Sequence, residues 1–585
     1  MGSSLPQIMD FTTLRAVVND LDGRILPSRF EKAQQSDPQT LQLGFRTLKG
    51  MVWLELSWWA ECPRLVQIPP PPRDGAGSTL AQQFQHGLRH LALVEMAQAG
   101  FERVVTFSFA SRPGDPVQRT LVLELMGRHS NVLLLDEAQR VIALGRQVRD
   151  HQSRVRPIGT GDRYVPPPPL QSIPPERSES FERWQKRLSL VPVTLAKALP
   201  QTYQGISPAL ARQLTANQTD SATDLLNTSV QDLNDRQWRD LYCQWQQWLT
   251  CLEQGQFSFI PADTNTNSYR VWQRNTSADS LDDPSPAPPS RAGDPLSLSL
   301  GRFYSAQLQN RALTQQSEEL RQQLKQAKQR EESQLEDQLS KLKATEQAPE
   351  LQQQADALLC LQSPNRDQID QAQKLYRRAK KLRRAVPLLE ERQRHHRQRL
   401  ELIDGTEAFL EDVLNADWDQ SEHRLQRLSD LRLEAQELLV PRQRGSKRQG
   451  LQRKQGQPQP LELQSPSGLS IQVGRNHRQN DWISLRQAKP GDLWFHAQEC
   501  PGSHVVLKAS AGPADDDDLS LAADLAALFS RARGNRRVAV VVVPVEQLQR
   551  IVGAGPGTVR HKGGTVRWAE PERAERQLQS GKLLA

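Results

Sequence analysis

The segment from Phe303 to Leu439 constrains the fold most, because it is long, charged and rich in glutamine. Leucines at 308, 320 and 324, and again at 335, 339 and 342, have the three-and-four-residue spacing of a two-helix coiled coil. We expect one helix from 303 to about 361, a turn in the SPNRD segment at 363–367, and a returning helix to 439. An arm of about forty residues extends about 60 Å at about 1.5 Å per residue. Such an arm reaches across a large partner and is not a catalytic core.

Composition indicates several domains and a polyanionic partner. The chain has 585 residues, of which 24% are charged and 37% hydrophobic, so part of its length is expected to be solvated helix or linker. A net charge of +8 suits nucleic acid or a membrane surface. Five scattered cysteines without a CxxC pair argue against a disulfide framework or zinc ribbon and favour the cytoplasm. Neither a secretory leader nor a run of eighteen apolar residues is present, so we expect no membrane association.

Residues 1–175 are expected to form a mixed α/β domain. The pattern predicts a helix over 11–21, a turn at Asp22-Gly23, and a second helix over 80–99 that ends at Gly100. A hairpin is predicted for 40–48 and 51–57 around Lys49-Gly50. Further strands are predicted over 104–109, 121–125 and 131–135.

Residues 176–274 are expected to be helical. Gly205-Ile206-Ser207-Pro208 separates two short helices within 190–218, and it is either a helix start suited to phosphate or a plain helical turn. Trp238, Trp245 and Trp248 recur at roughly helical spacing and are expected in the core. Residues 275–302 are predicted to be a flexible linker. Residues 441–460 are predicted to be a basic hinge, because 442–454 contain six Lys and Arg residues and no acid.

The segment DLWFHAQECPGSHVVLK, at 492–508, combines strand-like runs with unusual polar residues. Leu493–Phe495 is expected to be a buried strand, followed by His496 and the turn that leads into Val505-Val506. This arrangement is either a site for a polar, anionic ligand, with free amide groups in the turn, or a hairpin with structural histidines. Downstream we expect an exposed acidic loop at 515–518, a helix over 521–529, a strand over 536–543, a glycine-rich hairpin over 555–568 and a tail over 571–585.

Two segments of this region resemble a known family. VGRNHRQND at 473–481 and DLWFHAQECPGSHVV at 492–506 closely resemble the RNA-binding NFACT-R domain of the NEMF/RqcH family. That family comprises ribosome quality control factors, also described as fibronectin-binding protein A homologues. The resemblance implies RNA-binding residues at Arg475, Asn476, Gln479, Asn480, Asp481, Asp492, Trp494, His496, Pro501, Gly502, Ser503 and His504.

The N-terminal part also fits this family. ELMGRHSN at 124–131 matches the family signature E-x-x-G-R-x-S-N. We expect Arg128 to face a ligand, and Ser130 and Asn131 to hold the turn through local hydrogen bonds.

A second N-terminal candidate is the acid and base pair Glu102-Arg103. The family usually has Asp-Arg at this place, a pair implicated in holding transfer RNA, so the resemblance implies that Glu102 and Arg103 bind tRNA. The extra methylene of Glu102 moves the carboxylate and puts the geometry of that contact in question. The alternative is a surface ion pair of small energetic value.

Two basic segments are candidate RNA contacts. Arg146, Arg149, Arg154 and Arg156, together with Tyr164, combine arginines with an aromatic residue, although such a run is often a solvated face. The returning helix of the arm has a block without acids, for which contact with ribosomal RNA is weighed against solvated charge: Arg377, Arg378, Lys380, Lys381, Arg383 and Arg384. Family members often carry a small middle domain at the tip of the arm, where this chain has a brief connection.

The resemblance implies an α+β multidomain protein. Its parts are an NFACT-N domain similar to a glycosylase N-domain (1–175), a helix-hairpin-helix module (176–274), an antiparallel coiled-coil arm with a reduced middle domain (303–440) and an α/β NFACT-R domain (461–570). The implied function is that of a cytoplasmic, non-enzymatic factor that binds the large ribosomal subunit, through rRNA and ribosomal proteins, while peptidyl-tRNA obstructs it. Such a factor recruits tRNA, alanyl-tRNA in bacterial relatives, for C-terminal tailing of the stalled chain. No cofactor or metal is expected.

Two other functions stay open. A fibronectin-binding surface adhesin fits the older family name, but it would need a leader and an anchor that the sequence does not show. A DNA-repair glycosylase fits the fold of the family's first domain, but those enzymes attack with an N-terminal proline, whereas Gly2-Ser3-Ser4 follows the initiator Met here. The sequence also has no nucleophile–base triad, P-loop or HExxH motif.

Overall fold

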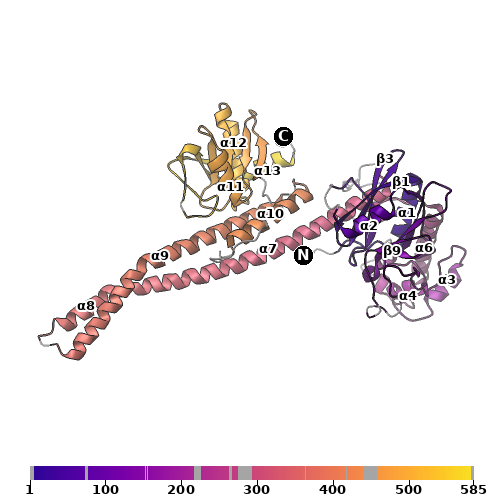
Figure 1. Ribbon diagram of the computed structural model, residues 1–585, viewed down its shortest axis with the longest axis horizontal. Coiled ribbons are helices and arrows are strands. Elements are labelled where there is room, and N and C mark those ends of the chain that lie inside the picture. The colour runs from indigo at the N-terminus through magenta and orange to yellow at the C-terminus, as the bar shows by residue number, and fades with distance from the viewer. Residues whose placement is uncertain are drawn as a thin grey trace. The chain divides into compact units, whose positions relative to one another are not determined.

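The computed structural model describes residues 5–72, 77–149, 151, 153, 156–215, 225–261, 267–273, 293–362, 364–416, 418–439, 457–551 and 553–580. The chain forms two compact units, residues 1–311 and 312–585, and the division falls within α7 (Leu296–Thr345) (Figure 1). A mixed α/β chain with a long helical region is thereby confirmed. Most of the predicted hinge at 441–460 and residues 275–292 of the predicted linker lie outside the described residues, whereas 296–302 of that linker belong to α7.

A nine-stranded antiparallel sheet forms most of the first unit, in the order β4-β3-β2-β1-β5-β6-β7-β8-β9. The predicted hairpin forms with its turn one residue earlier than expected, because Thr47 pairs with Gly50 and leaves Leu48 and Lys49 as a two-residue loop. The three later strands are confirmed as β6, β7 and β8, whereas β1, β4 and β9 were not predicted. The strands are β1 (Ser28–Asp37), β2 (Thr40–Thr47), β3 (Gly50–Ser57), β4 (Arg64–Ile68), β5 (Ala92–Ala97), β6 (Val104–Ala110), β7 (Arg119–Glu124), β8 (Asn131–Leu135) and β9 (Val141–Leu144).

The helix predicted over 80–99 is wrong. α2 (Thr79–Gly87) ends after nine residues, and β5 then pairs with β1 and β6. Between them His90 has a φ of 68°, which interrupts a right-handed helix. Leu93 and Met96 both reach the core, because a bulge between Leu93 and Glu95 shifts the strand by one residue. The apolar residues therefore imitate helical spacing.

α1 (Phe11–Ile25) packs its buried face into the core of this sheet. Asp10 caps the helix by accepting a hydrogen bond from the backbone amide of Thr13 at 2.9 Å. The predicted turn at Asp22-Gly23 is wrong, because the helix continues through both residues to Ile25, which is buried. That burial outweighs the low helix propensity of glycine.

Residues 181–254 contain the predicted helices: α3 (Phe181–Leu188), α4 (Leu195–Thr202), α5 (Pro208–Thr215) and α6 (Asp235–Gln254). Trp238, Trp245 and Trp248 lie on the buried face of α6 and pack with Trp184, so their predicted place in the core is confirmed. The indole nitrogen of Trp248 donates to the hydroxyl of Thr12 at 3.0 Å. This bond joins the helical module to α1. A small ribbon of β10 (Ile260–Pro261) and β11 (Tyr269–Arg270) follows.

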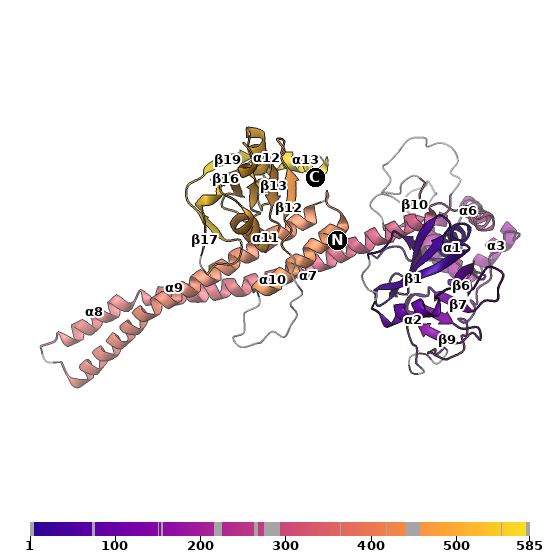
Figure 2. The ribbon, with the colours of Figure 1, turned by 45° about the horizontal axis from the view of Figure 1, so that its top comes forward.

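Long helices open the second unit (Figure 2). They are the remainder of α7, then α8 (Ala348–Leu359), α9 (Arg366–Asn415) and α10 (Ser421–Leu439). Helix α9 runs antiparallel to α7 and α8. The contacts of Lys328 with Asp404, Glu331 with His396, and Gln352 with Arg383 show this, because the residue numbers of α9 fall as those of α7 and α8 rise. The single returning helix predicted up to 439 is wrong, because α9 ends at Asn415 and α10 packs against it.

The packing between α7 and α9 changes along their length. Near the start of the unit, Leu320 and Leu324 are buried with Ile403 and Phe409. Farther along, the buried side chains of α7 are Glu331, Gln338 and Thr345. The leucine seam predicted there is wrong, since Leu339 is 40% exposed.

The second unit ends in a six-stranded antiparallel sheet, in the order β12-β13-β15-β14-β16-β19. The predicted strands at 493–495 and 536–543 are confirmed as β14 and β16. One face packs on α12, and residues next to α11 and the β17–β18 ribbon cover part of the other face. The elements are β12 (Leu461–Gln464), β13 (Ser470–Val473), α11 (His477–Trp482), β14 (Leu493–Ala497), β15 (Val505–Leu507), α12 (Asp516–Leu528), β16 (Val538–Pro544), β17 (Leu548–Arg550), β18 (Val559–His561), β19 (Thr565–Ala569) and α13 (Pro571–Gln579).

Three predictions for this sheet domain are wrong. The acidic segment at 515–518 is not an exposed loop, because Asp515 caps α12 and Asp518 is fully buried in a reciprocal capping box. The hairpin at 555–568 does not form, since β18 pairs with β17 while β19 pairs with β16. The tail at 571–585 begins as α13, which buries Ala574 and Leu578.

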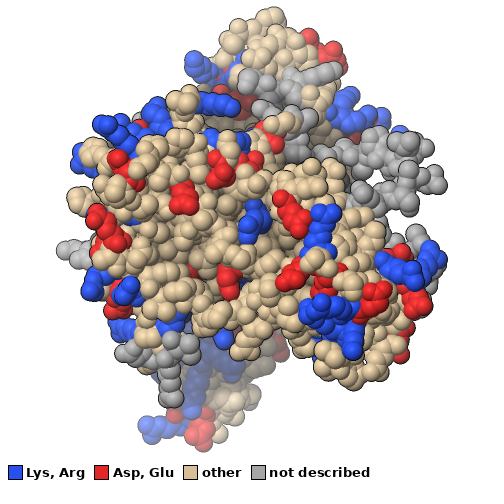
Figure 3. All heavy atoms as spheres, turned by 90° about the vertical axis from the view of Figure 1, so that its right-hand side faces the viewer, with Lys and Arg blue, Asp and Glu red and all other residues tan. Residues whose placement is uncertain are grey.

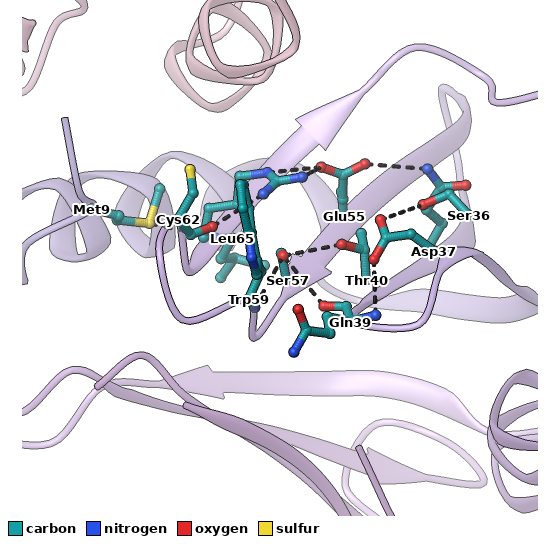
Figure 4. A network of polar contacts seen from close by, with 12 residues as sticks. Met9, Ser36, Asp37, Gln39, Thr40, Glu55, Ser57, Trp59, Cys62 and Leu65 are labelled. Carbon is teal, nitrogen blue, oxygen red and sulfur yellow. Dashed lines mark hydrogen bonds and ion pairs between the residues drawn. The ribbon is translucent and has the colours of Figure 1, made fainter. Parts of the chain in front are cut away.

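An ion pair is buried between β3 and β4 of the first unit (Figure 4). Two guanidinium nitrogens of Arg64 donate to one carboxylate oxygen of Glu55, at 2.9 and 2.7 Å. Gln42 donates to the other oxygen at 3.2 Å, and the carbonyl of Cys62 accepts from Arg64. Burial opposes the charge of Arg64, but Glu55 outweighs it and raises the arginine pKa. The pair is thus fully hydrogen-bonded where an unpaired charge would be costly.

Glu55→Gln should destabilise the sheet by about 3–5 kcal/mol, because it leaves the Arg64 charge buried without a counter-charge. The measurement is hydrogen exchange of peptides from β3 and β4 as urea is increased. Glu31→Gln is the matched control, since its partner Arg46 is 60% exposed and the pair should contribute less than about 1 kcal/mol. Equal effects of the two substitutions would contradict this account.

Candidate nucleic-acid interface

The segment at 473–481 folds into a tightly capped turn and helix. The side-chain oxygen of Asn476 accepts from the amide of Gln479 at 2.8 Å, and Gln479 accepts from the amide of Arg475 at 2.9 Å. These bonds fix the start of α11. The guanidinium of Arg475 is largely buried near Asp419, and burial lowers its pKa to about 10. Arg475 therefore lies inside the fold, not on an open face.

Asn480 joins α11 to the turn before β15. Its side chain accepts from the backbone amide of His504 at 3.0 Å and donates to the carbonyl of Gly502 at 3.3 Å. A side chain at Gly474 would collide with Asn480, since an added Cβ would lie 2.2 Å from its amide oxygen. Packing against Asn480 therefore requires a glycine at position 474.

The turn that was expected to offer free amide groups uses them internally. Ser503 donates its backbone amide to the carbonyl of Phe529 at 2.8 Å, and Gly502 forms a bridge with Ser530. An added Cβ at Gly502 would lie 2.7 Å from the Ser530 side chain. Pro501 accepts from the amide of Arg531 at 2.9 Å. The Ser503 amide is therefore not free for a ligand, which favours the structural-hairpin alternative.

His496 and His504 pack with Trp494, which lies on the face of the six-stranded sheet opposite α12. The rings of Trp494 and His496 stack with centroids 5.5 Å apart, and His504 meets both rings edge-on. Ser484 contacts Nδ1 of His504 at 2.8 Å. Burial lowers the pKa of His496 to about 4 and that of His504 well below 6.5, so both rings are neutral at pH 7. Neutral rings provide no charge for a phosphate.

The two aspartates of these segments are also bonded internally. Asp492 is fully buried and accepts from the amides of Lys489 and Ser510 at 2.8 and 3.2 Å. Burial raises its pKa, but these bonds and Lys508 outweigh burial and lower it. Asp481 forms an ion pair with Arg550 of β17. Both carboxylates therefore fix loops of the domain.

The N-terminus of α11 is anchored to α9 and α10. The ring of His477 lies 3.0 Å from the carbonyl of Leu402 in α9, where an added Cβ at Gly405 would lie 2.6 Å from the ring. Glu434 of α10 accepts from the amides of His477 and Arg478 at 3.1 and 2.8 Å. No local sequence pattern marks Glu434, because its partners lie more than forty residues away.

The sheet of the first unit brings the two N-terminal candidates to the same end of the neighbouring strands β6 and β7. The carbonyl of Arg103 accepts from the amide of Leu125 at 2.9 Å, so Glu102-Arg103 lies beside the turn that carries Arg128. Glu102 accepts from the amide of Leu170 at 3.3 Å. Burial lowers the pKa of Arg103, although Asp10 and Glu102 oppose the shift, so Arg103 remains a cation.

The residues around Arg128 differ in exposure and in bonding. Arg128 is exposed. Ser130 accepts from the amide of Met126 at 2.8 Å, and Asn131 bonds both backbone groups of Arg146, at 2.8 Å each. The geometry is consistent with a scaffold role for Ser130 and Asn131.

Glu124, the first residue of the signature, is buried and holds Arg156 and Tyr164. It accepts from Arg156 at 2.8 and 2.5 Å and from the tyrosine hydroxyl at 2.9 Å. These two members of the candidate RNA stretch are therefore committed to the fold. Arg146 donates to the carbonyl of Arg128, and the side chain or backbone of Arg149 likewise contacts another residue. Arg154 lies outside the described residues.

The carboxylate of Asp10 lies at the start of α5. Ser207 accepts from the amide of Leu210 at 2.9 Å, and its hydroxyl donates to the buried carboxylate of Asp10 at 2.6 Å. A phosphate at this helix start would be repelled by Asp10. The geometry favours the alternative of a plain helical turn.

The basic block of α9 is exposed along its whole length. Ala372 and Ala379 are buried, whereas the six cations are exposed: Arg377, Arg378, Lys380, Lys381, Arg383 and Arg384. Arg383 also donates to Gln352 of α8. By contrast, on the face of the molecule drawn in Figure 3, basic and acidic side chains are interspersed. The strongest concentration of one charge in the described part of the arm is therefore on α9.

Among the described residues, no group of three or more His, Cys, Asp and Glu side chains is arranged to hold a metal ion. No helix in the described part of the chain is both long and apolar enough to cross a membrane.

Acidification should loosen the C-terminal sheet domain. His477, like His496, has a pKa lowered to about 4 by burial, whereas an unfolded histidine has a pKa of about 6.5. The stability that depends on neutral rings is thus complete above about pH 6.5 and is lost as pH falls towards 4, at up to about 1.4 kcal/mol per pH unit and ring. Burial raises the pKa of Glu434 to about 7 and also raises that of Asp524, which has the opposite sign, but His477, His496 and His504 together outweigh these two carboxyl groups.

The measurement is hydrogen exchange of peptides from β14 and β15 at pH 7 and pH 5, corrected for intrinsic exchange. We expect lower protection at pH 5. His395→Gln, at an exposed position of α9, is the control and should not alter the difference. Equal protection at both pH values would show that burial of the three rings does not govern stability here.

Two family models match the chain. The family model of the NFACT N-terminal and middle domains matches residues 10–364, and the model of the NFACT protein RNA binding domain matches residues 461–563. The protein named Rqc2 homolog RqcH in Streptococcus pneumoniae is 26% identical, over 94% of this chain and 95% of that protein. Its namesake in Bacillus subtilis is 25% identical, over 82% and 83%.

Solved structures match over parts of the chain. The C-terminal part of the fibronectin/fibrinogen-binding protein from Streptococcus suis is 27% identical, with a TM-score of 0.37, over 46% of this chain and 98% of that one. The first family model alone matches more than half of the sequence. The chain belongs to the NFACT family, as its sequence motifs imply.

Proposed function

We propose that this protein is a ribosome quality control factor that binds the obstructed large ribosomal subunit with its peptidyl-tRNA and recruits tRNA for C-terminal tailing. Membership of the NFACT family, together with relatives named Rqc2 homolog RqcH along most of the chain, supports this function most strongly. Alanyl-tRNA is the proposed cargo, following bacterial relatives. We place the protein in the cytoplasm and propose no enzymatic role, because peptide bond formation belongs to the ribosome.

The proposed tRNA contact is the end of β6 and β7 that carries Glu102, Arg103 and Arg128. Two neighbouring arginines suit the phosphates of a folded RNA, and the backbone bond between Arg103 and Leu125 holds their loops together. The proposed rRNA contact is the exposed basic block of α9. These two surfaces belong to different units, so each can be removed without disturbing the other.

The finer fold assignments remain part of this proposal. We infer that α4 and α5, with Gly205 at a φ of 76° between them, form a helix-hairpin-helix unit on a glycosylase-like first domain, and that the long helices form a coiled-coil arm. Asp10 lies at the start of α5 and would repel a phosphate there. This unit would therefore support the strand ends that carry Glu102, Arg103 and Arg128, and would not bind phosphate itself.

An adhesin remains the second candidate, because a solved relative is described as a fibronectin/fibrinogen-binding protein. Binding of the purified protein to immobilised fibronectin distinguishes the two. Saturable binding at physiological salt, without association with ribosomal subunits, would favour the adhesin.

Arg103→Ala should abolish recovery of tRNA with the purified protein while leaving association with large subunits largely intact. The reason is that this substitution removes a phosphate contact of the first unit only. Sequencing of the copurified RNA measures the effect and identifies the tRNA. Arg112→Ala is the matched control, because Arg112 is exposed in the loop at the other end of β6. Loss of both activities, or of neither, would contradict this division of roles.

Neutralising the α9 block should weaken binding to large subunits and reduce its dependence on salt. Each phosphate contact contributes about 0.9 to the slope of log affinity against log salt, so the triple change Arg377→Ala, Lys381→Ala and Arg384→Ala should reduce the slope by up to about 3. Sedimentation through sucrose at increasing salt measures it. Arg392→Ala, Arg394→Ala and Arg397→Ala remove the same charge elsewhere on α9 and should have a smaller effect. Equal effects would show that net charge, not this block, determines binding.

A further inference from the structure

The outer face of β19 exposes a large aromatic side chain. Trp568 is 66% exposed and Val566, two residues earlier on the same face, is 52% exposed. Tryptophan usually buries most of its surface, so exposure of this extent beside another apolar residue indicates a binding surface. β19 is an edge strand of the sheet, next to β16 (Figure 2).

The register across the sheet shows how far this face extends. Val566 pairs with Val541, which pairs with His496, and Trp568 pairs with Ala539. Val541 is buried under the cluster that includes Trp482 and the β17–β18 ribbon. That cover does not include Val566 and Trp568. The sheet therefore has a covered part at β14 and an open part at β19.

Cations flank β19 in the sequence. The loop from 531 to 537 leads into β16 beside Trp568 and contributes Arg536 and Arg537, whereas Arg531 of this loop is paired with Asp404 and Glu407 of α9. The segment from 559 to 568 contributes Arg560 and Lys562, whereas Arg567 bonds Asp516 and Ser520 of α12 on the opposite face. Arg536, Arg560 and Lys562 are exposed. Glu570 faces Arg537 at 3.3 Å, but both groups are exposed and their pairing is weak.

We propose that the outer face of β19 binds single-stranded RNA, with an unpaired base stacked on Trp568 and neighbouring phosphates held by Arg536, Arg537 and Lys562. An exposed aromatic ring on a sheet, surrounded by cations, is suited to a splayed base and its backbone. A paired base is already stacked on both faces and cannot use the ring. This inference rests on the proposed RNA-binding function and adds the surface and the form of RNA. The family model ends at residue 563, before β19.

Charge favours RNA over a protein partner as the occupant. A second copy of this chain would bring the same cations to the same face, and their repulsion would oppose pairing through β19. Two apolar side chains also offer little area compared with a stable protein interface.

The test uses the full-length protein and a fluorescein-labelled oligo(U) RNA of about twelve nucleotides, within the site sizes of sheet-based binders. Fluorescence anisotropy should show that Trp568→Ala weakens binding by about five- to a hundredfold, the range for loss of one stacked base. Trp568→Phe keeps a ring and should remain within about threefold of the native protein, whereas Trp568→Leu keeps apolar volume only and should resemble Trp568→Ala. Binding to an RNA duplex of the same length should not change in any of the three.

Several results would overturn the proposal. One is an unchanged affinity of Trp568→Ala for the oligonucleotide, and another is an equal loss for duplex and single strand. A third is a decrease in sedimentation coefficient for Trp568→Ala, which would identify β19 as a contact between copies of the chain. Thermal unfolding of Trp568→Leu checks folding, and Leu48→Ala, which removes an exposed side chain of the first unit, is the control. Absence of ribosome association with retained oligo(U) discrimination would refute the proposed function while leaving this surface in place.

Discussion

The side chain of Asn480 is the contact on which the C-terminal sheet domain depends. One amide group accepts from His504 and donates to Gly502, and so links α11 to the hairpin of β14 and β15. Both partners are buried, so loss of either bond would leave an unsatisfied backbone group at a cost of about 1–3 kcal/mol. The surrounding glycines follow from this bond, because Gly474 and Gly502 provide the space that Asn480 and Ser530 occupy.

The same constraint explains why residues that mark the family are not those most available to RNA. Asn480, Asp492, Ser503 and His504 are buried and hydrogen-bonded within the domain. The first unit repeats the pattern, since the signature residue Glu124 is buried against Arg156 and Tyr164 while Arg128 is exposed. Residues with many internal partners constrain a sequence strongly, whereas surface cations can move by one position and still meet a phosphate. A signature therefore locates a domain better than it locates the ligand.

How far the sequence predicts this structure depends on the range of the interactions. The hairpin of β2 and β3, the strands β14 and β16 and the tryptophan face of α6 follow local patterns and were predicted. The pattern predicts one helix in place of α2 and β5, because a bulge near Glu95 gives apolar residues helical spacing. The four acids at 515–518 predict a loop, because their role depends on a capping box with the following helix. Glu434 and Asp10 could not be assigned, since their partners His477 and Ser207 are distant in sequence.

Apolar contacts and exposed cations lie in different parts of the arm. Its apolar contacts are concentrated around Leu320, Leu324 and Phe409, whereas the buried position Glu331 is held by His396 and Arg399. Toward the tip the buried side chains of α9 are small, Ala372 and Ala379, and like charges four residues apart, such as Lys380 and Arg384, oppose the helix by about 0.2–0.5 kcal/mol per pair. Bound phosphates would remove that repulsion. The proposed contact of the distal arm with ribosomal RNA would therefore also stabilise the arm itself.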